Sequence, residues 1–375
     1  MAKKAYIGVN GVAKAVKKAY VGVDGKARRI IKAYIGIGGV ARPCWAGGSE
    51  LSYYGTVTAL GQARSHLAAT AVGGYALFGG GMASDYAYHV DAYNETLTRS
   101  YPSGLSQARS GLAATSVGSY ALFAGGGYSG SVTFNYANEV DAYNESLTRS
   151  TPTALRSGRN ALKATTVGDY ALFAGGGEDV HVDAYNKSLT RTNPEGINDR
   201  LSGHAATTVG NYALFGGGYS GGDIAIVYAY NSSLTKTLPA ALSKARSQLA
   251  ATAVGDYALF GGGNQSSSVY MFSTVDAYNK SLTRTLPTEV SVARGYLAAT
   301  TIGGYALFGG GLEHSTYDES SVVDAYDASL TRTTPTRLNT AREVLTATAV
   351  GSFALFGGGN YNSTKQATVD AYTVT

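Results

Sequence analysis

Cysteine is almost absent from this chain of 375 residues, in which Cys44 is the single example. One thiol excludes an intramolecular disulfide framework and a thiolate metal cluster. The five histidines are scattered, with no H-x-x-x-H or Cys/His spacing typical of a metal site. They are His66, His89, His181, His204 and His314. We therefore expect neither a metal nor a cofactor.

Long apolar runs are also missing. No stretch approaches the roughly 20 consecutive apolar residues of a transmembrane helix. Lys14, Lys17 and Lys18 interrupt any apolar signal core after the basic start. We expect a protein made in the bacterial cytoplasm without a signal peptide and without membrane insertion. Lysis or an assembly would then carry it to the surface of a virion or another extracellular particle.

Proline and charge are scarce, whereas glycine and tyrosine are abundant. The chain has 7 prolines and 15% charged residues, against 50 glycines and 29 tyrosines. Low charge combined with Gly, Tyr, Ser and Thr is typical of an all-β, turn-rich protein rather than a disordered one.

One phrase, aromatic-Ala-Leu-Phe-(Gly/Ala)-Gly-Gly, occurs seven times at intervals of 42 to 50 residues. A strand-rich repeat of this length predicts a radial array of small sheets, and a closed array can hold such a long chain as one unit. The copies start at Tyr75, Tyr120, Tyr170, Tyr212, Tyr257, Tyr305 and Phe353.

Each repeat contains four strand-sized pieces, which in the second copy are residues 112–117, 120–123, 140–143 and 146–150. Gly118-Ser119 and Asn144-Glu145 are expected to form tight turns between them. The last copy stops at residue 375 without its fourth piece, and a lone strand at residues 51–57 precedes the first copy. We therefore predict a seven-bladed propeller over residues 49–375, closed by this entering strand, with no long free edge.

The repeats resemble kelch repeats over residues 50–375, which implies a propeller of four-stranded antiparallel blades. The glycine doublet ends the second strand, and the kelch tyrosine of the third strand is present as Tyr93, Tyr143, Tyr185, Tyr230, Tyr278, Tyr326 and Tyr372. The kelch tryptophan is missing, and leucine stands nearby as Leu97, Leu147, Leu189, Leu234, Leu282 and Leu330. Kelch-like oxidases need a cross-linked cysteine at their copper site, but Cys44 lies outside the repeats.

Residues 1–48 form a separate basic segment with a period of 14 and ten Lys or Arg against one acid, Asp24. Asn10-Gly11, Asp24-Gly25 and Gly38-Gly39 predict three β-hairpins, and Pro43–Gly48 is read as the join to the propeller. Hairpins this small need a partner for stability. We expect an anchor that docks on an acidic partner, with nucleic-acid binding as a less favoured alternative. Its candidate residues are Lys4, Tyr6, Lys18, Tyr20, Arg28, Arg29, Lys32 and Tyr34.

The hairpin phrases also resemble N-terminal sequences of virion proteins, such as tail or fibre proteins, from phages of Gram-positive bacteria. This resemblance implies attachment to virion or assembly proteins, in several copies of the chain. The order of the strands places the entry of the chain opposite the long loops, so we expect attachment at the back of the propeller and recognition at the front.

Sequence variation is concentrated in the links between second and third strands, which are rich in Tyr, Ser, Gly and Asn. This composition is typical of adaptable binding loops, although it also fits an ordinary polar surface. The candidate ligand-binding residues are Tyr86, Tyr88, Tyr128, Tyr136, Tyr219, Asn264, Tyr270, Tyr317, Asn360 and Tyr361.

Two rings of charge recur. Six arginines lie a fixed distance before a repeated threonine, and six aspartates begin the Asp-Ala-Tyr phrases. We interpret them as structural pairs that tie blade to blade, with an anion-binding ring as the alternative. The arginines are Arg64, Arg109, Arg159, Arg246, Arg294 and Arg342, and the aspartates are Asp91, Asp141, Asp183, Asp276, Asp324 and Asp370.

The sequence thus favours a non-enzymatic recognition or adhesion subunit of a phage-like particle that binds a host surface glycan or protein. One alternative is a glycan-active enzyme, because several carboxylates lie in or beside the variable loops. They are Asp85, Glu139, Asp179, Asp223, Glu313, Asp318 and Glu319. A second alternative is an intracellular protein-interaction scaffold. The cluster of Glu178, Asp179, His181 and Asp183 is read as a solvated turn rather than a metal site.

Overall fold

The computed structural model describes residues 6–9, 12–15, 19–23, 26–30, 32–37, 40–46, 50–129, 134–267, 270–314 and 316–374. The chain divides into two compact units, one that comprises the residues up to Leu51 together with the last two residues, and one that comprises Ser52–Thr373. The division falls three residues after the boundary expected from the sequence. None of the described residues forms a helix that is long and apolar enough to span a membrane.

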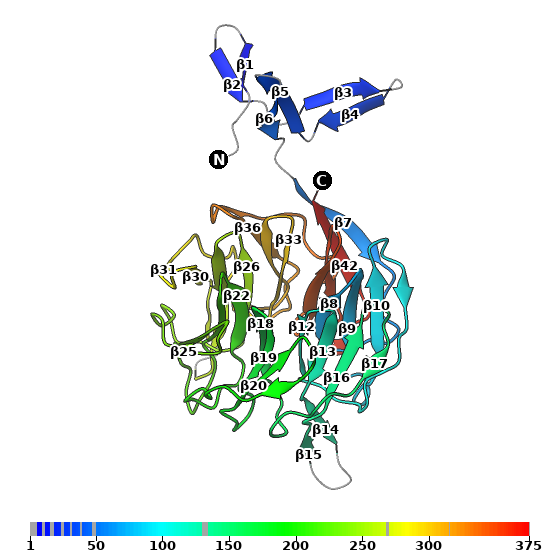
Figure 1. The fold of residues 1–375 in the computed structure, drawn as a ribbon, viewed down its shortest axis with the longest axis vertical. Helices are drawn as coiled ribbons and strands as arrows, with labels where there is room; N and C mark the ends of the chain where they lie inside the picture. Colours follow the sequence, from blue (N-terminus) through cyan, green and yellow to red (C-terminus); the bar gives the residue numbers. More distant parts are fainter. Residues whose placement is uncertain are drawn as a thin grey trace. The chain divides into compact units, whose positions relative to one another are not determined.

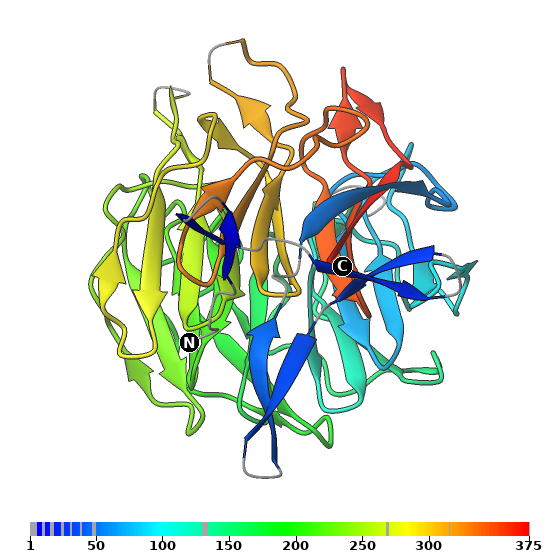
Figure 2. The same cartoon turned by 90° about the horizontal axis from the view of Figure 1, so that it is seen from above.

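The larger unit is a propeller whose sheets are arranged radially around a central axis (Figures 1 and 2). Each blade is a four-stranded antiparallel sheet that starts at the axis. Blade 1 comprises β8 (Ala68–Val72), β9 (Tyr75–Gly79), β10 (Val90–Asn94) and β11 (Arg99–Ser100). Blade 2 comprises β12 (Ala113–Val117), β13 (Tyr120–Ala124), β16 (Val140–Asn144) and β17 (Arg149–Ser150). Blade 3 comprises β18 (Lys163–Val167), β19 (Tyr170–Ala174), β20 (Val182–Asn186) and β21 (Arg191–Thr192).

The next three blades repeat this order. Blade 4 comprises β22 (Ala205–Val209), β23 (Tyr212–Gly216), β24 (Val227–Asn231) and β25 (Lys236–Thr237). Blade 5 comprises β26 (Ala250–Val254), β27 (Tyr257–Gly261), β30 (Val275–Asn279) and β31 (Arg284–Thr285). Blade 6 comprises β33 (Ala298–Ile302), β34 (Tyr305–Gly309), β36 (Val323–Asp327) and β37 (Arg332–Thr333).

Blade 7 joins the two ends of the propeller. It comprises β38 (Thr346–Val350), β39 (Phe353–Gly357), β42 (Val369–Val374) and, as its outer strand, β7 (Leu51–Val57). In Figure 1 the blue β7 lies beside the red β42. Tyr53 of β7 donates a hydrogen bond to Asp370 of β42 over 2.7 Å. The predicted fold class, including closure of the ring by the entering strand, is confirmed.

The outer strands are shorter than the sequence predicted. The fourth strand of blade 2 was expected over residues 146–150, but only Arg149–Ser150 pair with β16. The Asn144 side chain accepts hydrogen bonds from the backbone N–H groups of Ser146 and Thr148 and closes a wider turn. Leu147 lies inside this turn with a φ of 59° and packs partly buried on the neighbouring core. The leucines near the missing kelch tryptophan therefore serve as turn residues.

Interlocking side chains hold neighbouring blades together. Phe123 and Tyr143 of blade 2 pack against Leu77 of blade 1, and the two rings meet edge to face with centroids 5.9 Å apart. A Cβ atom on Gly79 would lie 2.8 Å from the Phe123 ring. The glycine at this position therefore makes room for the phenylalanine of the next blade. The same contact, Gly357 against Phe78, closes the ring between blades 7 and 1.

The recurring arginines and aspartates form buried ion pairs, which confirms their structural interpretation. Arg109 and Asp141 are 2.7 Å apart, with both side chains 0% exposed. Arg109 also donates to the carbonyl of Phe123 at the end of β13, and Asp141 accepts the backbone N–H of Ser106 in the incoming connection. Each pair thus fastens a connection to the blade that follows it, rather than tying blade to blade as expected.

Blade 4 builds this junction differently. Leu201 stands where the other blades have arginine, Tyr228 stands where they have aspartate, and both are fully buried. The Tyr228 hydroxyl donates to Asp199 and accepts the backbone N–H of Asn198. An apolar contact with one hydrogen-bonding hydroxyl therefore replaces the ion pair and still fastens the connection.

The described residues of the smaller unit form three β-hairpins, as predicted. They are β1 (Tyr6–Val9) with β2 (Val12–Ala15), β3 (Ala19–Val23) with β4 (Lys26–Ile30), and β5 (Lys32–Ile37) with β6 (Val40–Ala46). The expected join at Pro43–Gly48 is wrong in its first half, because Pro43 and Trp45 pair with β5 next to an irregularity at Ala33/Tyr34. The three predicted turn pairs lie outside the described residues.

The candidate anchor residues map onto these hairpins. Tyr6 lies in β1, Tyr20 in β3, Arg28 and Arg29 in β4, and Lys32 and Tyr34 in β5. Lys4 and Lys18 lie outside the described residues.

We expect β7 to be required for the closed ring and residues 1–48 to be dispensable for it. A protein starting at residue 50 should unfold within a few degrees of the full chain, because its seventh blade keeps all four strands. A protein starting at residue 58 should unfold at least about 10 °C lower or aggregate, because β42 becomes a free edge. Circular dichroism during heating measures both, and equal melting of the two shortened proteins would contradict the closure.

The pair Arg109–Asp141 can be exchanged for its blade 4 counterpart. Asp141→Ala should reduce the free energy of unfolding by about 3–5 kcal/mol, because it leaves the buried guanidinium of Arg109 without a counter-ion. The double variant Arg109→Leu/Asp141→Tyr should recover most of this loss. Urea unfolding of the wild type, of Asp141→Ala and of the double variant measures the free energy of unfolding of each. A loss below about 1 kcal/mol for Asp141→Ala would contradict the structural role.

Candidate functional site: the loop face of the propeller

All the long loops lie on one face of the propeller, because the strands within each blade are antiparallel. Two-residue turns join the first and second strands, as at Gly118-Ser119 between Val117 and Tyr120. Links from the second to the third strand, and from one blade to the next, emerge at the opposite edge. Three of these links carry small hairpins, which are β14 (Gly127–Ser129) with β15 (Phe134–Tyr136), β28 (Asn264–Gln265) with β29 (Tyr270–Met271), and β40 (Asn360–Tyr361) with β41 (Thr364–Lys365). In blade 6 the link begins with β35 (Leu312–Glu313), which pairs with β32 (Arg294–Gly295). Figure 1 shows the β14–β15 hairpin projecting from this face.

Exposed tyrosines recur on these loops. One tyrosine on the link between the second and third strands of six blades is between 41% and 53% exposed, whereas the short loop of blade 3, residues 175–181, has none. We call these six residues the tyrosine crown: Tyr88, Tyr136, Tyr219, Tyr270, Tyr317 and Tyr361. Six of the ten candidate ligand-binding residues are therefore presented on one face.

The other four candidates are less accessible. Asn264 and Asn360 are only 7% and 9% exposed. The Asn264 side chain accepts a hydrogen bond from Ser247, and that of Asn360 accepts one from Lys365, so both hold their loops in shape and are removed from the candidate contact surface. Tyr86 and Tyr128 are half-buried.

The loops of blades 4 to 7 are joined to one another in series. Asp223 of blade 4 accepts hydrogen bonds from the backbone N–H and the hydroxyl of Ser266 of blade 5, at 2.7 and 2.8 Å. Tyr270 of blade 5 packs on His314 of blade 6, with ring centroids 4.5 Å apart. Glu319 of blade 6 accepts the backbone N–H of Asn362 of blade 7 over 2.9 Å. Four crown tyrosines therefore stand on loops that support each other.

Hollows that contain a tyrosine ring lie among the described residues of the loops. One, of about 300 Å³, lies between the loops of blades 4 and 5 and is lined by Tyr219, Asp223 and Ser266 among others. The second, of about 160 Å³, lies beside Tyr136 and is lined by Arg159, Glu178 and Asp179. Both combine a tyrosine ring with polar groups, as sites for polar ligands do.

The acidic cluster in blade 3 is tied into the fold. Asp183 pairs with the buried Arg159 over 2.6 Å. Burial acts to raise the pKa of Asp179, but hydrogen bonds from Ser157 and from the backbone of His181, together with Arg159, hold that pKa below its ordinary value. Among the described residues, no group of three or more His, Cys, Asp or Glu side chains could hold a metal ion.

Most of the loop carboxylates that could serve an enzyme already accept hydrogen bonds within the protein. Asp223 and Glu319 join neighbouring loops. Glu313 accepts the hydroxyl of Ser320 over 2.7 Å, and Asp85 accepts the backbone N–H of Tyr86. These contacts give the carboxylates a role in shaping the loops.

The sequence reasoning missed Lys163, which lines the central channel. Five of the seven repeats have alanine at this register position, paired with the last residue of the second strand. An alignment of the seven repeats would have shown Lys163 as an exception, whereas a search for motifs does not.

Comparison with solved structures supports the fold. The solved structure titled "Structure of YjhT" superposes with a TM-score of 0.58 at 12% sequence identity, over 75% of this chain and 99% of that chain. It is one of 847 matching chains of solved structures. No protein-family model and no curated protein matches the chain. At this identity the likeness shows the fold alone: the chain forms a seven-bladed, kelch-like β-propeller similar to YjhT, a kelch-repeat protein.

Proposed function

We propose that the protein is a non-enzymatic recognition subunit that binds a host surface glycan or protein through the tyrosine crown. The observation that carries this proposal is the placement of one exposed tyrosine on the same face in six of seven blades. Tyrosine provides a large, rigid contact area at low cost in side-chain entropy, and it can stack on a sugar or on an apolar side chain.

The contacts between loops support the same proposal. A site that is already ordered loses less conformational entropy on binding than one built from free loops. The pairs Asp223–Ser266, Tyr270–His314 and Glu319–Asn362 give the crown of blades 4 to 7 this order. Repetition of weak contacts around the ring, and of the chain itself in an assembly, would add avidity.

In this proposal, residues 1–48 attach the protein to a phage or phage-like particle. The support is the basic charge of the segment and its resemblance to virion proteins. The acidic balance of residues 49–375, with 24 acidic and 20 basic residues, favours a glycan or protein ligand over nucleic acid. The particle surface is the corresponding site of action.

Removing the crown on three adjacent blades should weaken binding to cells strongly. We expect the triple variant Tyr219→Ser/Tyr270→Ser/Tyr317→Ser to attach to susceptible Gram-positive cells at least about tenfold more weakly, because each exposed ring contributes stacking area. The matched control, Lys187→Ser/Lys280→Ser, changes exposed side chains of the tight-turn face that pair with Asp169 and Asp256. Flow cytometry with fluorescent protein measures attachment. Unchanged attachment of the triple variant, with loss in the control, would place recognition on the other face.

The order of the loops should itself contribute to affinity. Asp223→Ala leaves Tyr219 and Tyr270 in place but removes both hydrogen bonds to Ser266. We expect attachment to weaken about three- to tenfold with little change in melting temperature, because the loops must then be ordered during binding. Amide hydrogen exchange of residues 262–274 should increase in the same variant. Faster exchange without weaker attachment would show that this order does not matter for recognition.

A further inference from the structure

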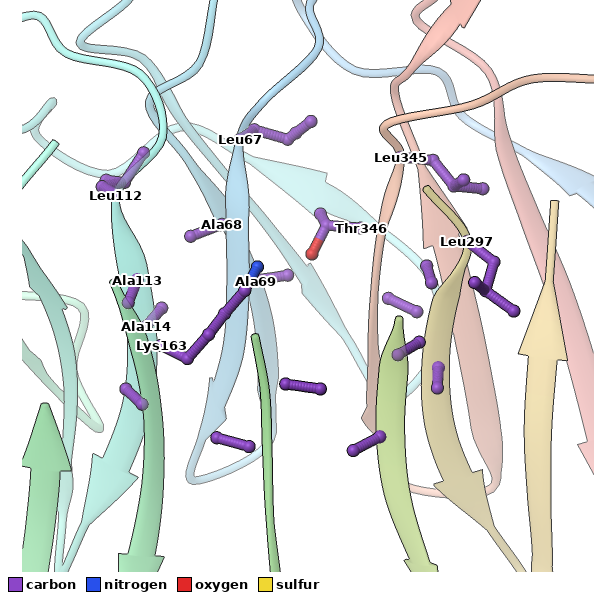
Figure 3. A pocket seen from close by; sticks show the side chains of 18 of the residues that line it. Leu67, Ala68, Ala69, Leu112, Ala113, Ala114, Lys163, Leu297, Leu345 and Thr346 are labelled. Atoms are coloured by element: carbon purple, nitrogen blue, oxygen red, sulfur yellow. The ribbon is translucent and has the colours of Figure 1, made fainter. Parts of the chain in front are cut away.

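The central channel ends in a cavity on the loop face. It has a volume of about 220 Å³ and is lined by the first residues of the inner strands together with the leucines that precede them. Since each inner strand starts at the edge that carries the long loops, the cavity opens beneath the tyrosine crown. Figure 3 shows Leu67, Leu112, Leu297 and Leu345 around its mouth. The cavity is smaller than the roughly 300–1,000 Å³ of drug-sized sites, so it admits only the end of a ligand.

The side chains that line this cavity are apolar apart from those at two positions. Residues in the same register form a layer that is alanine in five blades, as Ala68, Ala113, Ala205, Ala250 and Ala298. Blade 7 places Thr346 in this layer, and blade 3 places Lys163. The Lys163 side chain extends into the cavity (Figure 3). A cation here is a departure from the repeat and not a requirement of the fold.

Lys163 is available to a ligand. Its side chain is exposed to the channel, and among the described residues no carboxylate lines the cavity with it. Enclosure in the channel displaces part of the water around Lys163 and lowers its pKa, so an anion that replaces this water would stabilise its charged form.

The positive field of Lys163 reaches two histidines. Burial above all, together with Lys163, lowers the pKa of His204 to about 3, so His204 is neutral at pH 7. Burial, Lys365 and Lys163 lower the pKa of His66 as well. His66 directly precedes Leu67 at the mouth of the channel, so its titration reports on charge in the cavity.

The loops outside the cavity limit the charge of the ligand. Asp223, Glu313 and Glu319 lie on the same face and would repel a polyanion. One ammonium among alanines can neutralise one negative charge, whereas a phosphate dianion requires more donors. The tyrosine crown, in turn, suits a neutral stem with hydroxyl groups and apolar faces.

We propose that the mouth of the channel binds a single carboxylate, carried on a neutral polar stem, with the Lys163 ammonium as its counter-ion. The inference rests on the proposed function, since it names the end group of a ligand that passes through the tyrosine crown.

Three related sugars test this inference: D-glucuronate, D-glucose and D-glucose 6-phosphate. Calorimetric titration of the full-length protein should show saturable binding of glucuronate, with glucose at least about tenfold weaker because it lacks the carboxylate. Glucose 6-phosphate should bind no better than glucuronate. Equal binding of glucuronate and glucose, or a clear preference for the phosphate, would overturn the proposal.

Lys163→Ala is a matched variant, because it installs the residue of five other blades. It should melt at the wild-type temperature and lose the preference for glucuronate over glucose, and Lys163→Arg should retain that preference. Glucuronate should raise the pKa of His66, followed by NMR, in the wild type but not in Lys163→Ala. A preference that survives in Lys163→Ala would contradict the assignment.

The triple tyrosine variant separates this inference from the proposed function. It should keep the His66 response to glucuronate, because Lys163 is intact. If cells bind independently of the crown but glucuronate still depends on Lys163, the carboxylate site stands and the proposed function fails. If the crown is required for attachment but glucuronate does not bind, the proposed function stands and the carboxylate site fails.

Discussion

The contact on which the propeller depends is that of a phenylalanine ring with the small residue that ends the second strand of the preceding blade. Phe123 fits over Gly79, and Phe78 fits over Gly357 in the same way. Each blade supplies a phenylalanine and a small residue, which is glycine in five blades and alanine in blades 2 and 3 (Ala124 and Ala174). The ring is complete when the last blade meets the first. A side chain larger than that of alanine at this position would push two sheets apart. This requirement explains why the phrase around the phenylalanine is nearly invariant, and why variation is left to the loops.

A second set of contacts attaches the connections between blades. The buried tyrosine of every third strand donates its hydroxyl to a backbone carbonyl of the incoming connection, as Tyr143 does to Ser103 over 2.8 Å. Burial raises the pKa of Tyr143, which keeps the hydroxyl a donor. The aspartate two residues earlier accepts a backbone N–H of the same connection. Fixed connections hold the loop face together, so the variable loops can change without loss of the ring.

The sequence predicted the parts of the structure that repeat. Strand positions, the number of blades and closure by residues 51–57 follow from spacing, because each copy must satisfy the same packing. The outer strand of blade 2 was too long in the prediction because the Asn144 side chain caps the turn, and propensity does not reveal this. Asn264 and Asn360 were misplaced for a related reason. Their composition fits a binding loop, but their exposure depends on partners such as Ser247 and Lys365, which only the fold brings near.

Comparison of the repeats also shows which residues that differ from the common pattern are compensated within their blade and which are not. Blade 4 replaces an ion pair by Leu201 and Tyr228, and the Tyr228 hydroxyl keeps the connection attached, so this departure is compensated within the blade. Lys163 in blade 3 has no such compensation, since its neighbours in the layer remain mostly alanine. The Lys163 side chain is exposed to the channel, and the fold does not require a cation there. An opening beneath six exposed tyrosines is where a ligand would use such a residue.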